Sequence, residues 1–325
     1  MIERTMIESA LALRAAGEPF TVATVVAVTG SASRPPGTHM LVARDSRWWR
    51  TEGQAPIVVS YDAREPTTEP DELRDALALG FDGVVEILVE RDAPGSVDSI
   101  AFIARCREME QRGAIITVIG GELPVGMRLA VEAGGDWWGA VELRDFIPAA
   151  REAIALGESR VVTLGGVRAA IEAVVPPPRL FVLGAGLDAR PLADIARAIG
   201  WDVLQMPATT ERETLIHAID ASDRAAVIVM NHDVAADVAS LGAALASKAA
   251  YIGVLGPRRR TEALLAELGC PAMDPRIRAP VGLAIGAETP PEIALSIVAE
   301  VQAVLAGAPA SPLRDQPAIA EDEAA

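Results

Sequence analysis

A glycine-rich segment, Gly184-Ala185-Gly186-Leu187-Asp188-Ala189, has residue types and spacing suited to binding a phosphate. It joins a predicted strand over 179–184 to a predicted helix over 187–199, and it has the GxGxxA form of the dinucleotide-binding fingerprint. In that pattern Gly184 makes a tight turn, and Gly186 lets a phosphate approach the backbone. The free N–H groups of the helix would then face the anion. The segment predicts a phosphate site, with an empty loop as the alternative.

The next predicted strand, 201–206, argues against an ordinary nicotinamide site. It ends in Gln205 and Met206 and is followed by Pro207, where a dinucleotide site usually has an acidic residue for the ribose hydroxyl. No arginine stands there to bind a 2′-phosphate either. We therefore do not expect NAD(P) to be the physiological ligand, and another phosphate-bearing molecule and an empty loop are the alternatives.

Polar side chains follow the third predicted strand of this region, over 225–230. Asn231 and His232 come directly after it, at the strand end that faces the ligand in open α/β sheets. His232 has the chemistry of a proton donor or a metal ligand, and Asp233 is placed to orient it. The alternative is that Asp233 only caps the helix that follows.

Two further segments combine glycine with arginine. Gly256 ends a predicted strand, and Arg258, Arg259 and Arg260 open the next helix of an otherwise acidic chain. Cations there oppose the helix dipole, so an anion or an acidic partner is expected to compensate. The alternative is a solvated, basic helix start.

The second such segment, Arg34-Pro35-Pro36-Gly37, follows a predicted strand over 21–30. Its stiff backbone would hold Arg34 for bidentate binding of an anionic group, and the alternative is a purely structural turn. Two cysteines, Cys106 and Cys270, read as ordinary packing residues, and the sequence suggests neither a catalytic residue set nor a metal-ligand cluster.

The elements that position these residues fall into two regions on either side of three prolines, Pro176, Pro177 and Pro178. Consecutive prolines favour a stiff, extended spacer, so we predict a mixed α/β domain over 1–175 and a second domain over 179–306. Strands and helices alternate in the second domain, which predicts a Rossmann-like parallel sheet. Residues 307–325 are small, proline-rich and acidic, and predict a disordered tail.

The first domain is expected to mix strands and helices. Helices are predicted over 3–16, 70–80, 96–112 and 146–157, and strands over 21–30, 39–44, 55–62, 82–91 and 114–120, with a hairpin over 161–175.

Composition narrows the class of protein. The net charge of −16 argues against binding to nucleic acid, which requires a basic surface. The sequence has neither a signal-peptide pattern nor an apolar run long enough to span a membrane. With two isolated cysteines in 325 residues, these features predict a cytoplasmic protein.

Taken in order, the motifs resemble the XdhC/CoxI family of xanthine dehydrogenase accessory factors. The similar segments are TVVAVTGSASRPPGTHMLVARD near the N-terminus, then LFVLGAGLDARPLADIARAIGWDV, AAVIVMNHDVAADVASL, AAYIGVLGPRRRTEALL and APVGLAIGAETPPEIALSIVAEV. The resemblance implies a protein that transiently binds the molybdenum cofactor, a molybdopterin, and assists its sulfuration and insertion. The implied partners are a molybdenum hydroxylase apoenzyme and a cysteine desulfurase, and a homodimer is possible by analogy.

The sequence departs from the family at its usual cysteines. Relatives usually carry a cysteine between glycines ahead of a strand, where this chain has Gly80-Phe81-Asp82-Gly83. A glycine–cysteine loop after the first signature is also missing. Two alternatives therefore stand beside the cofactor carrier: a scaffold of the maturation machinery that does not bind cofactor, and an NAD(P)-dependent oxidoreductase.

Overall fold

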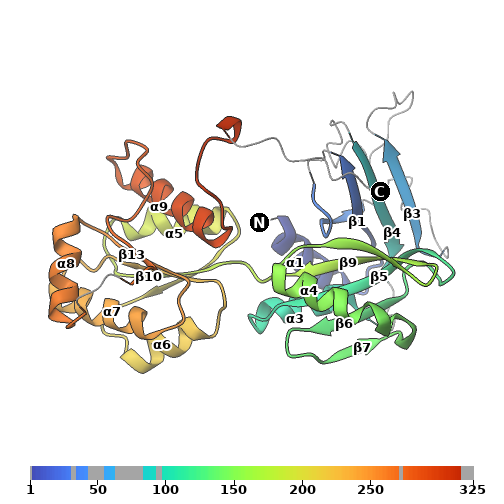
Figure 1. Cartoon of the computed structure of the whole chain (residues 1–325), viewed down its shortest axis with the longest axis horizontal. Coiled ribbons are helices and arrows are strands. Elements are labelled where there is room, and N and C mark those ends of the chain that lie inside the picture. Colours follow the sequence, from blue (N-terminus) through green and yellow to red (C-terminus); the bar gives the residue numbers. More distant parts are fainter. Residues whose placement is uncertain are drawn as a thin grey trace. The chain divides into compact units, whose positions relative to one another are not determined.

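A computed structural model of the chain shows two compact units that divide between Pro176 and Pro177 (Figure 1). The division lies within the proline run. The residues that the structure describes are 2–30, 34–42, 55–62, 83–92, 97–270 and 274–315.

The C-terminal unit contains a five-stranded sheet in which every neighbouring pair is parallel. Its strands are rich in β-branched residues that are buried on both faces, as expected for a parallel sheet covered by helices. The spatial order of the strands is β11-β10-β12-β13-β14. The strands are β10 (Arg179–Leu183), β11 (Asp202–Met206), β12 (Ala225–Val229), β13 (Tyr251–Val254) and β14 (Ile277–Arg278).

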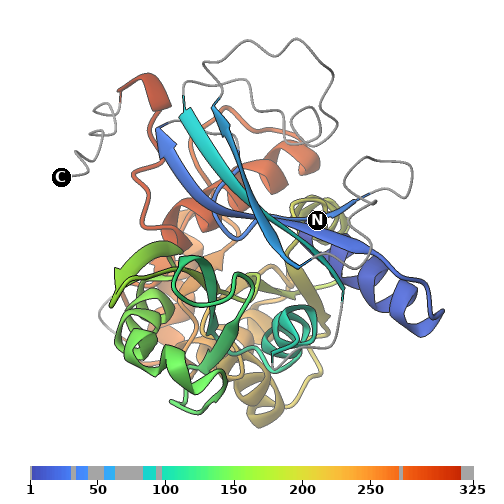
Figure 2. The ribbon, with the colours of Figure 1, turned by 90° about the vertical axis from the view of Figure 1, so that its right-hand side faces the viewer.

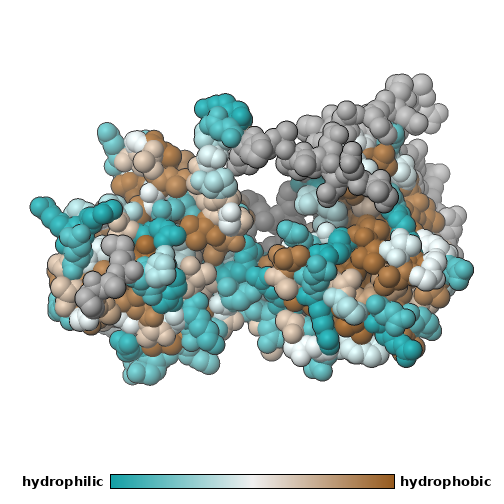
Figure 3. All heavy atoms as spheres, viewed as in Figure 1, coloured by the Kyte–Doolittle hydropathy of each residue, from teal (hydrophilic) through white to brown (hydrophobic). Residues whose placement is uncertain are grey.

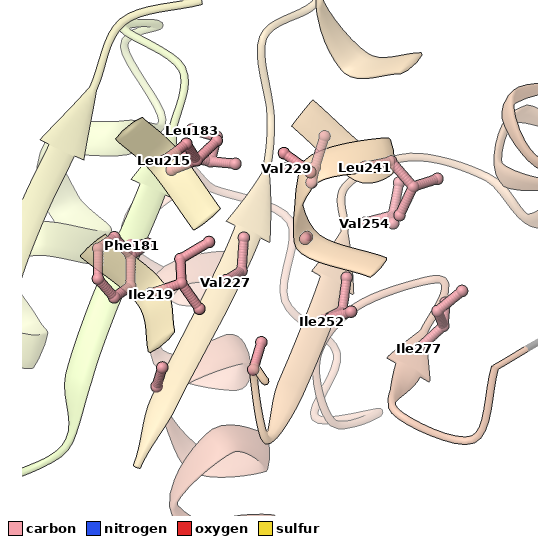
Figure 4. Close-up of a cluster of buried hydrophobic side chains, with 14 of the residues drawn as sticks. Phe181, Leu183, Leu215, Ile219, Val227, Val229, Leu241, Ile252, Val254 and Ile277 are labelled. Carbon is pink, nitrogen blue, oxygen red and sulfur yellow. The ribbon is translucent and has the colours of Figure 1, made fainter. Parts of the chain in front are cut away.

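Helices cover both faces of this sheet (Figure 1). Alternate strand residues point to opposite faces, so Phe181 and Val227 pack on one side while Leu180 and Ile228 pack on the other. The first side, shown in Figure 4, is closed by α6 (Arg212–Asp220), α7 (Val234–Ala246) and α8 (Arg258–Glu267). The second is closed by α5 (Ala189–Ala198) and α9 (Pro290–Leu305). The predicted Rossmann-like, doubly wound sheet is confirmed.

Local signals place several helix ends in this unit. Thr289 and Glu292 form a capping box at the start of α9. Asp233 caps α7 by accepting a hydrogen bond from the Ala236 N–H at 2.8 Å, as the simpler interpretation predicted. By contrast, α5 begins at Ala189 rather than at Leu187 as predicted, because the glycine-rich loop runs on to Asp188.

Arg276 fastens the amino edge of the sheet to the end of α7. Its guanidinium donates to the carbonyl oxygens of Ser247 at 2.7 Å, Ala249 at 3.2 Å and Leu245 at 2.9 Å. It also donates to the Asp274 carboxylate at 2.8 Å and 3.0 Å. The side-chain hydrogen bond from Arg276 is the main cause that lowers the pKa of Asp274 below its ordinary value.

We expect this pair to make stability depend on acid pH. A carboxyl group with a lowered folded-state pKa stabilises the fold above its ordinary pKa of 3.8, and the contribution is lost as the pH falls through the folded-state value. The unfolding free energy of the wild type should therefore fall more steeply below about pH 4 than that of Asp274→Asn. Urea unfolding at a series of pH values measures this, and identical slopes for the two proteins would contradict it.

The N-terminal unit is built on two antiparallel sheets. One has the order β2-β1-β4-β3, and its long strands β1, β4 and β3 lie side by side in Figure 2. The other has the order β7-β6-β5-β9-β8. The strands are β1 (Thr21–Gly30), β2 (His39–Val42), β3 (Ile57–Asp62), β4 (Gly83–Arg91), β5 (Gly113–Gly121), β6 (Arg128–Glu132), β7 (Trp137–Gly139), β8 (Arg160–Leu164) and β9 (Val167–Val174).

Helices and ion pairs between the sheets complete this unit. The helix α1 (Ile2–Ala15) packs with α3 (Ser99–Glu108), and α4 (Ile147–Leu156) packs on β5 and β9. Glu86 on β4 pairs with Arg168, and Glu90 on the same strand pairs with Arg128, so the two sheets are joined by ion pairs. The predicted hairpin is confirmed as β8 and β9.

Some predicted elements differ or lie outside the described residues. The helix predicted over 96–112 is shorter, because Asp98 caps its start and the backbone turns left-handed at Glu110 after its end. The helix predicted over 70–80 and most of the predicted acidic tail fall outside the described residues, although Leu313–Asp315 form a 3-10 turn.

No helix in the described part of the chain is long and apolar enough to cross a membrane. On the face shown in Figure 3, hydrophobic and hydrophilic residues alternate over both units.

Candidate functional site

The carboxyl edge of the parallel sheet brings the predicted glycine loop and the predicted polar residues together. Leu183 and Val229 are register partners, so the loops that follow β10 and β12 start side by side. β11 lies on one side of β10 and β12 lies on the other, so the order in which strands are added to the sheet reverses between β10 and β12. The helices that follow these two strands, α5 and α7, cover opposite faces of the sheet. In open α/β sheets, ligands bind at such a switch point.

Position 184 requires glycine, because the backbones of the two loops approach each other closely there. Its φ is +144°, and a Cβ placed on it would lie 2.4 Å from the Met230 carbonyl oxygen. No side chain fits in that space. Any residue but glycine would push the loop after β10 away from the loop after β12, which is the turn-forming role expected for Gly184.

His232 lies against the same loop. A Cβ placed on Gly186 would be 2.9 Å from His232 Nε2, and this nitrogen is 3.7 Å from Asp188 Oδ2. His232 has a φ of +62°, a left-handed conformation that is uncommon for a non-glycine residue. The predicted orienting role of Asp233 is wrong, because that carboxylate is committed to the cap of α7, and Asp188 faces the imidazole instead.

A buried carboxylate, Asp237, connects three segments of this edge. Its Oδ1 accepts hydrogen bonds from Asn231 N at 2.9 Å and Asn231 Nδ2 at 3.1 Å. Its Oδ2 accepts from Arg260 Nη2 at 2.7 Å, and the Asp237 side chain is 2% exposed. Asn231 Nδ2 also donates to Ser240 Oγ at 3.1 Å. Asp237 therefore fixes the Asn231 amide and ties the start of α8 to α7.

The ion pair with Asp237 sets Arg260 apart from the other two arginines of the run. Arg260 faces Asp237, and its Cδ lies 3.0 Å from the position of a Cβ on Gly256, so Gly256 makes room for it. Arg258 and Arg259 are exposed on the first turn of α8. Of the three, these two are the ones available to an anion outside the protein.

The predicted Arg34–Gly37 segment belongs to the N-terminal unit, where it folds as a tight turn. Gly37 N donates to Val25 O at 2.8 Å, and Thr38 Oγ1 donates to Pro35 O at 2.8 Å. Pro36 and Gly37 line a cavity of about 20 Å³ between the two antiparallel sheets. That volume holds about one water molecule and no larger ligand.

His39, to which the sequence assigned no role, is buried beside this cavity. Its Nε2 lies 2.7 Å from Glu172 Oε1, and its Nδ1 lies 3.0 Å from Thr24 Oγ1. A Cβ on Gly37 would be 3.2 Å from Glu172 Cγ, so the same glutamate supports the turn. Pro35, Pro36 and Gly37 thus have a structural explanation, and Arg34 stays a candidate anion ligand.

Asp188 and Asp237 lie at the carboxyl edge, although neither was predicted as a residue of the site. Asp237 had a detectable signal, since it is the charged residue within the otherwise apolar helix VAADVASLGAALA. A charged residue there needs a partner, but nothing local identifies Arg260, which is 23 positions away.

The two cysteines differ in solvent exposure, and neither lies at the carboxyl edge of the parallel sheet. Burial, with the nearby Glu132 carboxylate, raises the pKa of the Cys106 thiol to about 12. Cys270 is half-buried and precedes β14, which puts it at the amino edge of the parallel sheet. Within the described residues, no group of three or more His, Cys, Asp or Glu side chains is placed to hold a metal ion.

We expect iodoacetamide at pH 8 to label Cys270 much faster than Cys106, because the thiolate is the nucleophile and Cys106 is both buried and protonated. Peptide mass spectrometry of the native protein measures the two rates. Equal labelling in native protein would contradict the described burial, while equal labelling in urea is the expected control.

Comparison with known proteins follows the same division of the chain. Residues 180–301 match the XdhC Rossmann domain, which spans the parallel sheet and the glycine loop. Residues 13–54 match the XdhC and CoxI family, which spans β1 and the Arg34–Gly37 turn. The chain belongs to the XdhC and CoxI family.

Two curated relatives align over most of the chain. A probable xanthine dehydrogenase subunit of Bacillus subtilis (strain 168) is 27% identical over 319 residues, covering 87% of this chain and 92% of the relative. The molybdenum cofactor insertion chaperone PaoD of Escherichia coli (strain K12) is 26% identical over 313 residues, covering 93% and 88%. A crystal structure of a xanthine dehydrogenase from Bacillus halodurans matches the fold with a TM-score of 0.70, at 20% identity over 98% of each chain.

Proposed function

We propose that the chain is an accessory factor for a molybdenum hydroxylase, which holds the molybdenum cofactor transiently and assists its sulfuration and insertion. Family membership supports the general role, as do relatives named as a molybdenum cofactor insertion chaperone and as part of a probable xanthine dehydrogenase. The client apoenzyme and a cysteine desulfurase are the proposed partners.

The geometry that carries this proposal is the packing of the glycine loop on the loop after β12. Gly184 and Gly186 bring backbone without side chains to the switch point of the sheet, beside the first turn of α5. Molybdopterin carries a phosphate, for which such an arrangement is suited. Arg258 and Arg259, exposed after β13 at the same edge, would add positive charge.

The positions of the cysteines bear on the sulfuration step. Cys106 lies buried in the N-terminal unit, and Cys270 lies at the opposite edge of the parallel sheet from the glycine loop. This chain therefore has no thiol beside the proposed cofactor site. We propose that the cysteine desulfurase, rather than a thiol of this chain, supplies the sulfur.

Cofactor retention tests the proposal. The full chain would be mixed without oxygen with molybdenum cofactor freshly released from a donor enzyme, then passed over a gel-filtration column. We expect molybdenum and oxidised pterin to elute with the protein at about one per chain. Arg258→Ala with Arg259→Ala should reduce retention, as should Arg34→Ala, whereas Arg197→Ala, an exposed arginine in the last turn of α5, serves as a matched charge control.

A scaffold that binds partners but no cofactor is the second candidate, and the absence of cysteine between Gly80 and Gly83 favours it. Absence of molybdenum and pterin from the protein peak would support the scaffold and refute the carrier. Under either function we expect no heat release on titration with NAD(H) or NADP(H), because β11 ends at Met206 and Pro207 without a carboxylate for the ribose.

A further inference from the structure

The amide of Asn231 has one defined orientation. Its Nδ2 donates to Asp237 Oδ1 and to Ser240 Oγ, both at 3.1 Å. If the amide were flipped, its oxygen would face a carboxylate that already accepts a hydrogen bond from Asn231 N. The contact with Arg260 keeps that carboxylate in place. The carbonyl oxygen Oδ1 of Asn231 must therefore point away from this network.

This oxygen is buried and accepts no hydrogen bond from any of the residues that the structure describes. A buried acceptor without a donor is costly, and such atoms in native proteins call for an explanation. The next residue, His232, has a left-handed backbone and lies against Gly186. Two unfavourable features at adjacent residues, directly on the switch point of the sheet, are typical of a ligand-binding loop.

We infer that Asn231 Oδ1 accepts a hydrogen bond from the 2-amino group of the cofactor's pterin ring. The inference rests on the proposed function. An amide oxygen accepts only, so it selects a group that carries N–H or O–H. A phosphate at neutral pH is chiefly an acceptor, whereas the pyrimidine edge of a pterin carries an amino group and a ring N–H.

The phosphate and the pterin ring of the ligand are thus bound by different parts of the site. The backbone at Gly184 and Gly186 takes the phosphate, and Asn231 takes the ring. Asp237 and Ser240 are positioning residues: they hold the amide nitrogen and leave its oxygen for the ligand.

The test compares two fluorescent probes with the same anionic group. Pterin-6-carboxylate has the 2-amino group, whereas lumazine-6-carboxylate keeps the ring N–H and has an acceptor oxygen in place of the amino group. The pair therefore isolates the contact to the amino group. We expect the wild type to bind the pterin at least tenfold more tightly in fluorescence polarisation, since a site built for a donor rejects an analogue that lacks it. Asn231→Ala should bring the ratio close to one, while Ser247→Ala, at the opposite end of α7, is the control that should keep it.

The outcomes separate this inference from the proposed function, because molybdenum retention is measured on the same preparations. If the wild type retains molybdenum but binds the pterin and lumazine probes equally well, the inference is overturned and the proposed function stands. A ratio that survives in Asn231→Ala overturns it too. If the wild type binds neither cofactor nor pterin, both fall. The wild-type ratio requires no variant, so a folding defect in Asn231→Ala leaves the test valid.

Discussion

Replacing Gly184 by alanine is expected to destabilise the C-terminal unit by roughly 2–4 kcal/mol, which is among the larger effects of a single substitution. The added Cβ would meet the Met230 carbonyl oxygen at 2.4 Å and its carbon at 2.7 Å. Both are backbone atoms, so no rotamer change relieves the clash. The φ of +144° adds strain for any residue with a side chain. Denaturant unfolding of the full chain, followed by circular dichroism, measures the loss.

A second glycine of the same unit provides the control. Gly269 has a φ of +67°, and a Cβ placed there would meet no atom within 4 Å. Gly269→Ala should therefore lose only the left-handed backbone penalty, about 1 kcal/mol. Equal losses for the two variants would show that the contact between the loops after β10 and β12 is not the cause.

Removing Arg260 is expected to destabilise the same unit by roughly 3 kcal/mol. Arg260→Ala would leave the Asp237 carboxylate buried without its 2.7 Å partner, and an uncompensated buried charge is costly. The loss should also loosen the Asn231 amide, because Asp237 holds both groups. Hydrogen exchange at the start of α7 and α8, with the unfolding free energy, measures the two consequences.

Arg258 and Arg259 supply the matched control, since both are exposed arginines of the same helix turn. Either one changed to alanine should alter stability by less than about 0.5 kcal/mol, as for most surface positions. If Arg260→Ala behaves like these two, Asp237 does not depend on the ion pair.

Much of the C-terminal fold could be predicted because its signals are local. The alternation of strands and helices, the glycines after β10 and the capping box at Thr289 each depend on residues within a few positions of one another. The same holds for Asp233, whose cap on α7 the sequence offered as the simpler interpretation. In the N-terminal unit, the strand over 21–30 and the hairpin of β8 and β9 were predicted for the same reason.

The chemistry of the site depends on contacts that cross the sequence. His232 was predicted to work with its neighbour Asp233, but the folded chain places Asp188 beside it, 44 positions earlier. The run of three arginines looked like one patch, yet Arg260 is withdrawn to neutralise Asp237 while the other two stay exposed.

The sequence by itself determined that a glycine loop opens a helix after a buried strand and that polar residues end the third strand. These features follow from backbone preferences and residue periodicity, which act over a few residues. Only the tertiary structure decided that β10 lies between β11 and β12, which brings the glycine loop onto Asn231 and His232. Strand order and the pairing of buried charges are set by packing across the whole unit, so no local pattern specifies them.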